Sequence, residues 1–89
     1  MRQDIKKSAE RRLAIIGGQV EGVREMVVNE KYCVDIITQI EAAREALAGV
    51  GDLVLENHLE THVADDIKHG KGRKATAEIL KVYKLSRKG

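Results

Sequence analysis

The sequence predicts an all-α protein that forms one domain, residues 1–89. The chain contains no proline, phenylalanine or tryptophan, and its apolar residues recur every three or four positions, as one face of a helix requires. An all-β fold is close to excluded because it needs many turns, in which proline is common. A single chain of this length buries too little surface to be very stable, so we expect an oligomer.

The first predicted helix covers residues 4–28. Its apolar stripe consists of Ile5, Ala9, Leu13, Ile16, Val20, Val23 and Val27. A short polar break at residues 29–31 follows, and a connection this short usually joins antiparallel neighbours. The sequence therefore predicts a helical hairpin at this end of the chain.

The second predicted helix begins near Lys31 and continues past His62. Its apolar stripe consists of Ile36, Ile40, Ala43, Leu47, Val50 and Val54. Gly49 and Gly51 fall inside it, and each costs up to about 1 kcal/mol relative to alanine. Neighbouring alanines favour a continuous helix in which small residues allow close packing. The alternative is a helical hairpin that folds at residues 49–51.

A third, short helix is predicted from Arg73 to about Leu85. Two glycines in residues 69–72 predict the loop before it, because closely spaced glycines end a helix. Its apolar residues include Ala75, Ile79 and Val82. We expect residues 86–89 to fray.

The charges are unevenly distributed. The net charge is +2 overall, but residues 1–12 carry +3, residues 48–66 carry −5 and residues 67–89 carry +7. Basic ends can indicate nucleic-acid contact, and the alternative is a solvated surface with a lysine-rich tail. No apolar run reaches the length of a membrane span and no signal peptide is evident. We therefore expect a cytoplasmic protein with no membrane partner.

Cys33, His58 and His62 are the candidate metal ligands. His58 and His62 are four residues apart, so a helix places both on one face. Cys33 precedes His58 by 25 residues, about 38 Å along a continuous helix. Two such helices paired antiparallel would bring Cys33 of one chain to the histidines of the other, with the two-fold axis near Ala46 and Leu47. A hairpin would instead form the site within one chain.

Other uses of the single cysteine are weaker. One cysteine excludes an internal disulfide and a four-ligand zinc finger within one chain. Cys33 with a histidine could form a nucleophilic pair, but the chain has no oxyanion-hole motif and is too small for a deep pocket. We therefore predict that the protein is not an enzyme.

Several segments resemble the copper-sensitive operon repressor (CsoR) family. They are Tyr32–Ile40, Glu56–His62, Arg12-Leu13 and Gly18–Gly22, and the resemblance covers almost the whole chain. It implies an all-helical repressor with three helices per chain, a dimer of dimers, and no helix-turn-helix motif. Such proteins bind operator DNA without metal and are released by their inducer, which here implies control of copper resistance or efflux genes.

The resemblance implies a Cu(I) site made by Cys33 of one protomer and His58 and His62 of another. His62 stands where the family commonly has cysteine. A thiolate with two imidazoles also suits Zn(II). Residues 1–12 lack the histidine of the nickel and cobalt branch, and the chain lacks the second cysteine of the persulfide-sensing branch. A sensor of zinc, nickel, cobalt or a thiol-reactive molecule stays an alternative, as does a metal-binding protein without DNA binding.

The resemblance also assigns supporting roles. Tyr32 and Glu78 match residues that lie behind the metal ligands, although packing for Tyr32 and a solvated ion pair with Lys74 for Glu78 are the alternatives. Arg12 matches a basic residue that binds DNA, and Arg11 and Lys7 extend its basic face. A position of the second helix that is often basic in the family is Gly49 here.

Overall fold

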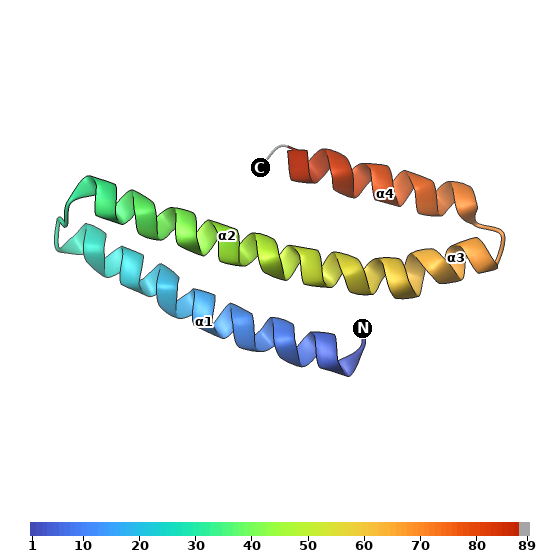
Figure 1. The fold of residues 1–89 in the computed structure, drawn as a ribbon, viewed down its shortest axis with the longest axis horizontal. Helices are drawn as coiled ribbons and strands as arrows, with labels where there is room; N and C mark the ends of the chain where they lie inside the picture. Colours follow the sequence, from blue (N-terminus) through green and yellow to red (C-terminus); the bar gives the residue numbers. More distant parts are fainter. Residues whose placement is uncertain (88–89) are drawn as a thin grey trace. The chain divides into compact units, whose positions relative to one another are not determined.

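The computed structural model describes residues 1–87, and the regular structure in that range is helical throughout (Figure 1). The elements are α1 (Gln3–Val28), α2 (Cys33–His58), the π-helical segment η1 (Leu59–Val63), α3 (Ala64–Lys68) and α4 (Gly72–Arg87). They form two compact units, Met1–Leu55 and a second that begins at Glu56. The all-α prediction is confirmed.

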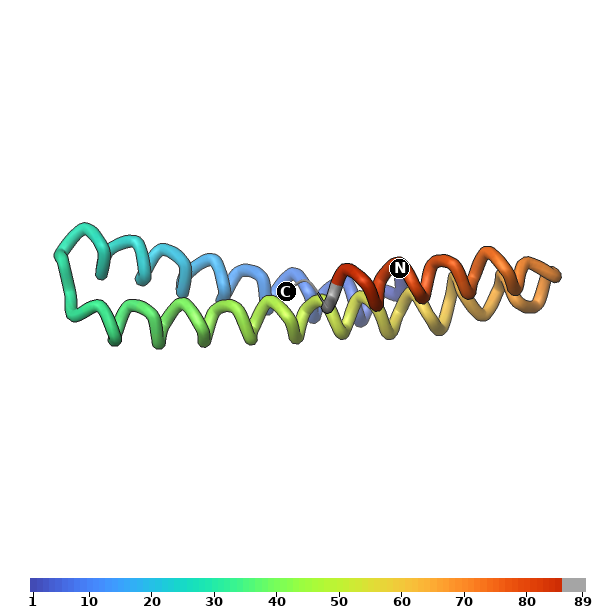
Figure 2. The backbone as a smooth tube through the Cα atoms, turned by 90° about the horizontal axis from the view of Figure 1, so that it is seen from above, coloured from blue at the N-terminus to red at the C-terminus, as the bar shows by residue number. Residues whose placement is uncertain are grey.

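In the first unit, α1 and α2 lie side by side and run antiparallel (Figures 1 and 2). The backbone N–H groups of Asn29 and Lys31 donate to the carbonyls of Glu25 and Met26, which closes the end of α1. Glu30 takes a left-handed conformation, with φ of 49°. These bonds end α1 where the polar break predicted it.

A small aliphatic core joins the two helices. Ala9, Ile16 and Val50 are buried together, and Ala46 and Leu53 pack against them. The two predicted stripes are longer than this contact. Ile5 and Ala43 are also buried, but several other members remain accessible, including Leu13 at 46%, Ile40 at 45% and Leu47 at 47% exposure. The hairpin thus covers only part of each apolar face.

Helix α2 passes through Gly49 and Gly51 without a break. The alternative of a hairpin at this point is therefore wrong, and the prediction of a continuous helix is confirmed. Apart from the adjacent residues and the local backbone of the helix, a Cβ atom added at either glycine would meet no described atom within 4 Å. The packing of α1 on α2 does not require glycine at these positions.

The helical run continues from α2 through η1 into α3, so the second helix extends past His62 as predicted. One turn differs from the prediction. In η1 the N–H of Ala64 donates to the carbonyl of Leu59, five residues earlier, which is the wider hydrogen-bond pattern of a π-helix. Such turns are frequent at functional sites, and this one contains His62.

The chain then reverses at residues 69–71, and α4 returns antiparallel to α3 (Figure 1). Gly70 has a φ of +77°, and the N–H of Lys71 donates to the carbonyl of Asp66 at 2.6 Å. Ala75 is the most buried residue of α4, at 1% exposure. Helix α4 extends two residues beyond its predicted end, and residues 88 and 89 of the expected frayed end lie outside the described range.

No helix within residues 1–87 is both long and apolar enough to cross a membrane.

Alanine substitutions at the two glycines that flank Lys71 should change the free energy of unfolding in opposite directions. Gly70→Ala should lower the free energy of unfolding by about 1–2 kcal/mol, because alanine is strained at positive φ. Gly72→Ala should raise it by up to about 1 kcal/mol, since Gly72 lies in α4 and a Cβ there meets no neighbour. Urea unfolding of both variants checks this, and equal effects would contradict it.

Candidate metal centre

His58 and His62 lie next to each other in the second unit. His58 is the last residue of α2 and His62 belongs to η1. Their ring centroids are 5.1 Å apart, and the ring planes differ by 25°, so the imidazoles stack. The side chains of two potential metal ligands are therefore neighbours in one helical segment.

Glu78 connects α4 to this pair. Its Oε2 lies 3.0 Å from Nε2 of His58, and both side chains are about one-third exposed, at 34%. An ionised carboxylate only accepts hydrogen bonds, so Nε2 of His58 donates its proton to Glu78. In the neutral ring, Nδ1 of His58 then carries the lone pair. Lys74, the other partner considered for Glu78, lies 4.0 Å from Asp66 instead.

Thr61 also contacts this histidine pair, although the sequence did not mark it as a candidate residue. Its hydroxyl donates to the carbonyl of Asn57 at 2.7 Å, and the same oxygen lies 3.1 Å from Nδ1 of His62. Asn57 is itself buried, at 3% exposure. The sequence did contain a signal for this contact. In a helix, a threonine can hydrogen-bond the carbonyl four residues earlier, and Thr61 stands directly before His62.

Cys33 and Tyr32 belong to the first unit. Cys33 is the first residue of α2 and has an exposed, free thiol. Tyr32 directly precedes it and is 69% exposed. Among residues 1–87, no group of three or more Cys, His, Asp and Glu side chains could hold a metal ion. Within the second unit, His58, His62 and Glu78 lie together.

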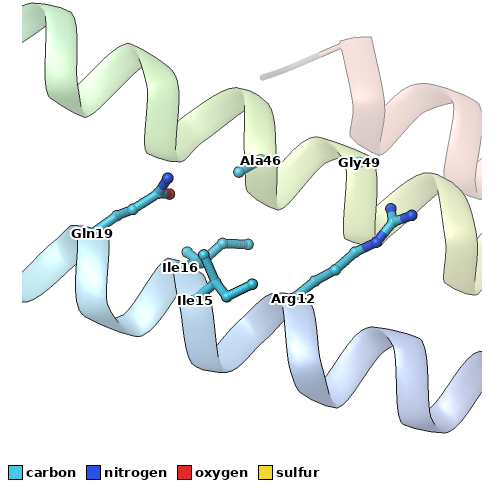
Figure 3. Close-up of a pocket in the computed structure, with 6 residues that line it drawn as sticks. All are labelled: Arg12, Ile15, Ile16, Gln19, Ala46 and Gly49. Atoms are coloured by element: carbon cyan, nitrogen blue, oxygen red, sulfur yellow. The ribbon is translucent and has the colours of Figure 1, made fainter.

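The candidate DNA-binding residues all lie on α1 with exposed side chains: Lys7, Arg11 and Arg12. Arg12 extends toward α2 beside Gly49, along a shallow groove of about 280 Å³ (Figure 3). At the start of α1, Arg2 hydrogen-bonds Asp4 at 2.8 Å, and this bond lowers the pKa of the Asp4 carboxyl. Because that carboxylate partly neutralises Arg2, the cationic character of α1 is concentrated at residues 6–12.

The sequence model of the metal-sensitive transcriptional repressors matches residues 5–85. The chain belongs to this family. It is 48% identical over 73 residues to the copper-sensing transcriptional repressor CsoR of Bacillus subtilis. This match covers 82% of this chain and 72% of that protein. The copper-sensing transcriptional repressor RicR of Mycobacterium tuberculosis is 37% identical over 65 residues. This second match covers 73% of this chain and 68% of RicR.

A solved structure of the family has the same fold. The copper-sensing repressor CsoR of Geobacillus thermodenitrificans, crystallised with Cu(I), superposes with a TM-score of 0.89 at 37% identity. The match covers 98% of this chain and 91% of that one. Family membership confirms the predicted class of protein, a transcriptional repressor and not an enzyme.

Proposed function

We propose that this protein is a copper-responsive repressor that binds operator DNA without metal and leaves it when it binds Cu(I). The observation that carries the proposal is the stacked pair of His58 and His62, with His58 held by Glu78, in a chain of this family. Relatives named as copper-sensing repressors support copper as the inducer. The donor set agrees, because a thiolate and two imidazoles suit Cu(I) or Zn(II) better than a hard cation.

The ligands come from two protomers in this proposal, with Cys33 from one and His58 and His62 from the other. The supporting argument is the length of α2. Cys33 and His58 are its first and last residues, and 25 residues of helix separate them by about 38 Å. Antiparallel pairing of two α2 helices brings each Cys33 to the histidines of the opposite chain and forms two equivalent sites.

The exposed apolar residues support this assembly. Leu13, Ile40 and Leu47 are each nearly half exposed in the single chain, and burial of such side chains is the main favourable term in association. The open space beside Gly49 leaves room for a second backbone near the proposed two-fold axis. We propose an antiparallel dimer that pairs further into a tetramer, in which residues 1–89 act as one domain.

The basic residues of α1 supply the proposed contact with DNA. Arg12, Arg11 and Lys7 are exposed, and arginine and lysine side chains provide most of the affinity for phosphate groups. Because a repressor acts on DNA, we propose a cytoplasmic location, no membrane partner, and copper resistance or efflux genes as targets.

Metal binding can release DNA only if it favours a quaternary state that binds DNA less well. Glu78 offers a route for this coupling. It lies on α4 and holds His58, so a change in the position of His58 is passed to α4. Tyr32 adjoins Cys33 and would lie at the same metal centre from the other protomer.

The function is tested by operator binding. Metal-free protein should bind DNA from upstream of its own gene, and Cu(I) should weaken that binding by roughly five- to 150-fold, the range of a coupling of about 1–3 kcal/mol. Fluorescence anisotropy with each metal in turn measures this. If Zn(II), Ni(II) or Co(II) released the DNA and Cu(I) did not, the inducer would be that other metal. If the metal-free protein did not bind the DNA at all, the protein would be a metal-binding protein without a repressor function.

The ligand set is tested by mixing two inactive chains. Cys33→Ser chains and chains with both His58→Ala and His62→Ala should each lose tight Cu(I) binding. Equal coexpression should restore about one quarter of the wild-type copper, because half of the dimers are mixed and each has one complete site. A site within one chain predicts no restoration. X-ray absorption should show one sulfur and two nitrogens per copper.

Two variants separate DNA binding from coupling. Arg12→Ala should weaken DNA binding, reduce the salt slope by about one for each lost phosphate contact, and leave Cu(I) affinity unchanged. Glu78→Ala should leave metal-free DNA binding near the wild-type level and reduce copper-driven release, because α4 then loses its bond to His58. If Cu(I) released Glu78→Ala from DNA as effectively as it releases the wild-type protein, Glu78 would take no part in coupling.

A further inference from the structure

The hydroxyl of Thr61 makes two contacts whose donors and acceptors can be assigned. It donates to the carbonyl of Asn57 at 2.7 Å, and its oxygen lies 3.1 Å from Nδ1 of His62. A threonine hydroxyl has one proton, and a carbonyl oxygen can only accept. The Thr61 proton therefore goes to Asn57, and Nδ1 of His62 must donate its own proton to the Thr61 oxygen.

This assignment fixes which nitrogen of His62 is free. A neutral imidazole carries one ring proton, so a proton on Nδ1 leaves the lone pair on Nε2. His58 has the opposite arrangement, because its Nε2 donates to Glu78 and its lone pair lies on Nδ1. The two stacked rings, 5.1 Å apart, thus offer a metal ion chemically different nitrogens.

We propose that Thr61 is a positioning residue that holds His62 ready to bind the metal ion through Nε2. The inference rests on the proposed function, in which His62 is a ligand. Neutral imidazole in water favours the proton on Nε2, where it blocks that atom. The Thr61 oxygen favours the other tautomer by accepting the proton of Nδ1. A thiolate at this position would need no such residue, because sulfur has no tautomers.

The backbone around Thr61 suits it to this role. Its carbonyl partner belongs to Asn57, which is 3% exposed and lies in the last turn of α2. Thr61 and His62 both lie in η1, where Ala64 donates to Leu59. The backbone is therefore hydrogen-bonded in a helix both before and after Thr61, which holds the hydroxyl in place. The hydroxyl thus restrains the orientation of the His62 ring as well as its tautomer.

The test uses three threonine variants. Thr61→Val removes the hydroxyl and keeps the shape, and Thr61→Ser restores the hydroxyl. Thr38→Val is the matched control, because Thr38 Oγ1 makes the same type of bond to the carbonyl of Val34, at 2.8 Å, and contacts no histidine in the described hydrogen bonds. Any general effect of losing a hydroxyl–carbonyl bond in a helix should appear in this control.

The first measurement is the ¹⁵N NMR spectrum of the histidine rings in metal-free protein, at a pH where they are neutral. His62 should carry its proton on Nδ1 in the wild type, the Ser variant and the Thr38 variant. In Thr61→Val the proton should move predominantly to Nε2. A wild-type His62 with its proton on Nε2 would overturn the proposal, whatever its metal affinity.

The second measurement is Cu(I) affinity by competition with a chelator. Thr61→Val should bind Cu(I) about tenfold or more weakly than wild type, the range for loss of a hydrogen bond behind a ligand. Thr61→Ser and Thr38→Val should stay near wild type. Equal affinities for the two valine variants would overturn the role of Thr61.

His62→Ala separates this inference from the proposed function. A large loss of Cu(I) affinity in His62→Ala, with none in Thr61→Val, would reject Thr61 alone. Unchanged affinity in His62→Ala would reject His62 as a ligand and the positioning role with it.

Discussion

The unbroken course of α2 is the constraint on which the arrangement of this protein depends. Two glycines in a helix interior cost up to about 2 kcal/mol together, yet the chain stays helical through Gly49 and Gly51. Cys33 is consequently fixed at one end of the helix and His58 at the other. Since a helix does not shorten, a site that uses both residues needs a second chain. The proposed metal site therefore depends on the proposed dimer.

The modest core of the hairpin leads to the same conclusion. Ala9, Ile16 and Val50 bury well, but small side chains at the contact leave much of each apolar stripe accessible. A chain of this size gains little stability from such a core alone. The exposed leucine and isoleucine side chains therefore favour association, and the proposed dimer covers them while it completes the metal site.

The histidine pair depends on a different kind of interaction. Hydrogen bonds decide which nitrogen each ring offers: Glu78 from α4 acts on His58, and Thr61 within η1 acts on His62. A metal ion needs the deprotonated nitrogen of each ring. The neighbours of the histidines therefore decide which nitrogen each ring offers in the proposed metal site. Glu78 also connects the proposed site to α4.

The sequence by itself determined the succession of helices, the end of the first one and the spacing of the candidate ligands along the chain, because apolar periodicity, polar breaks and paired glycines act locally. It predicted the end of α1 at Val28 and the continuous α2, and the family resemblance identified Glu78. Only the tertiary structure decided that Glu78 reaches His58, that one turn of the long helix is π-helical, and that the Thr61 hydroxyl lies beside Nδ1 of His62. These features depend on contacts near 3 Å between groups whose positions follow from packing, and no periodicity in the sequence records them.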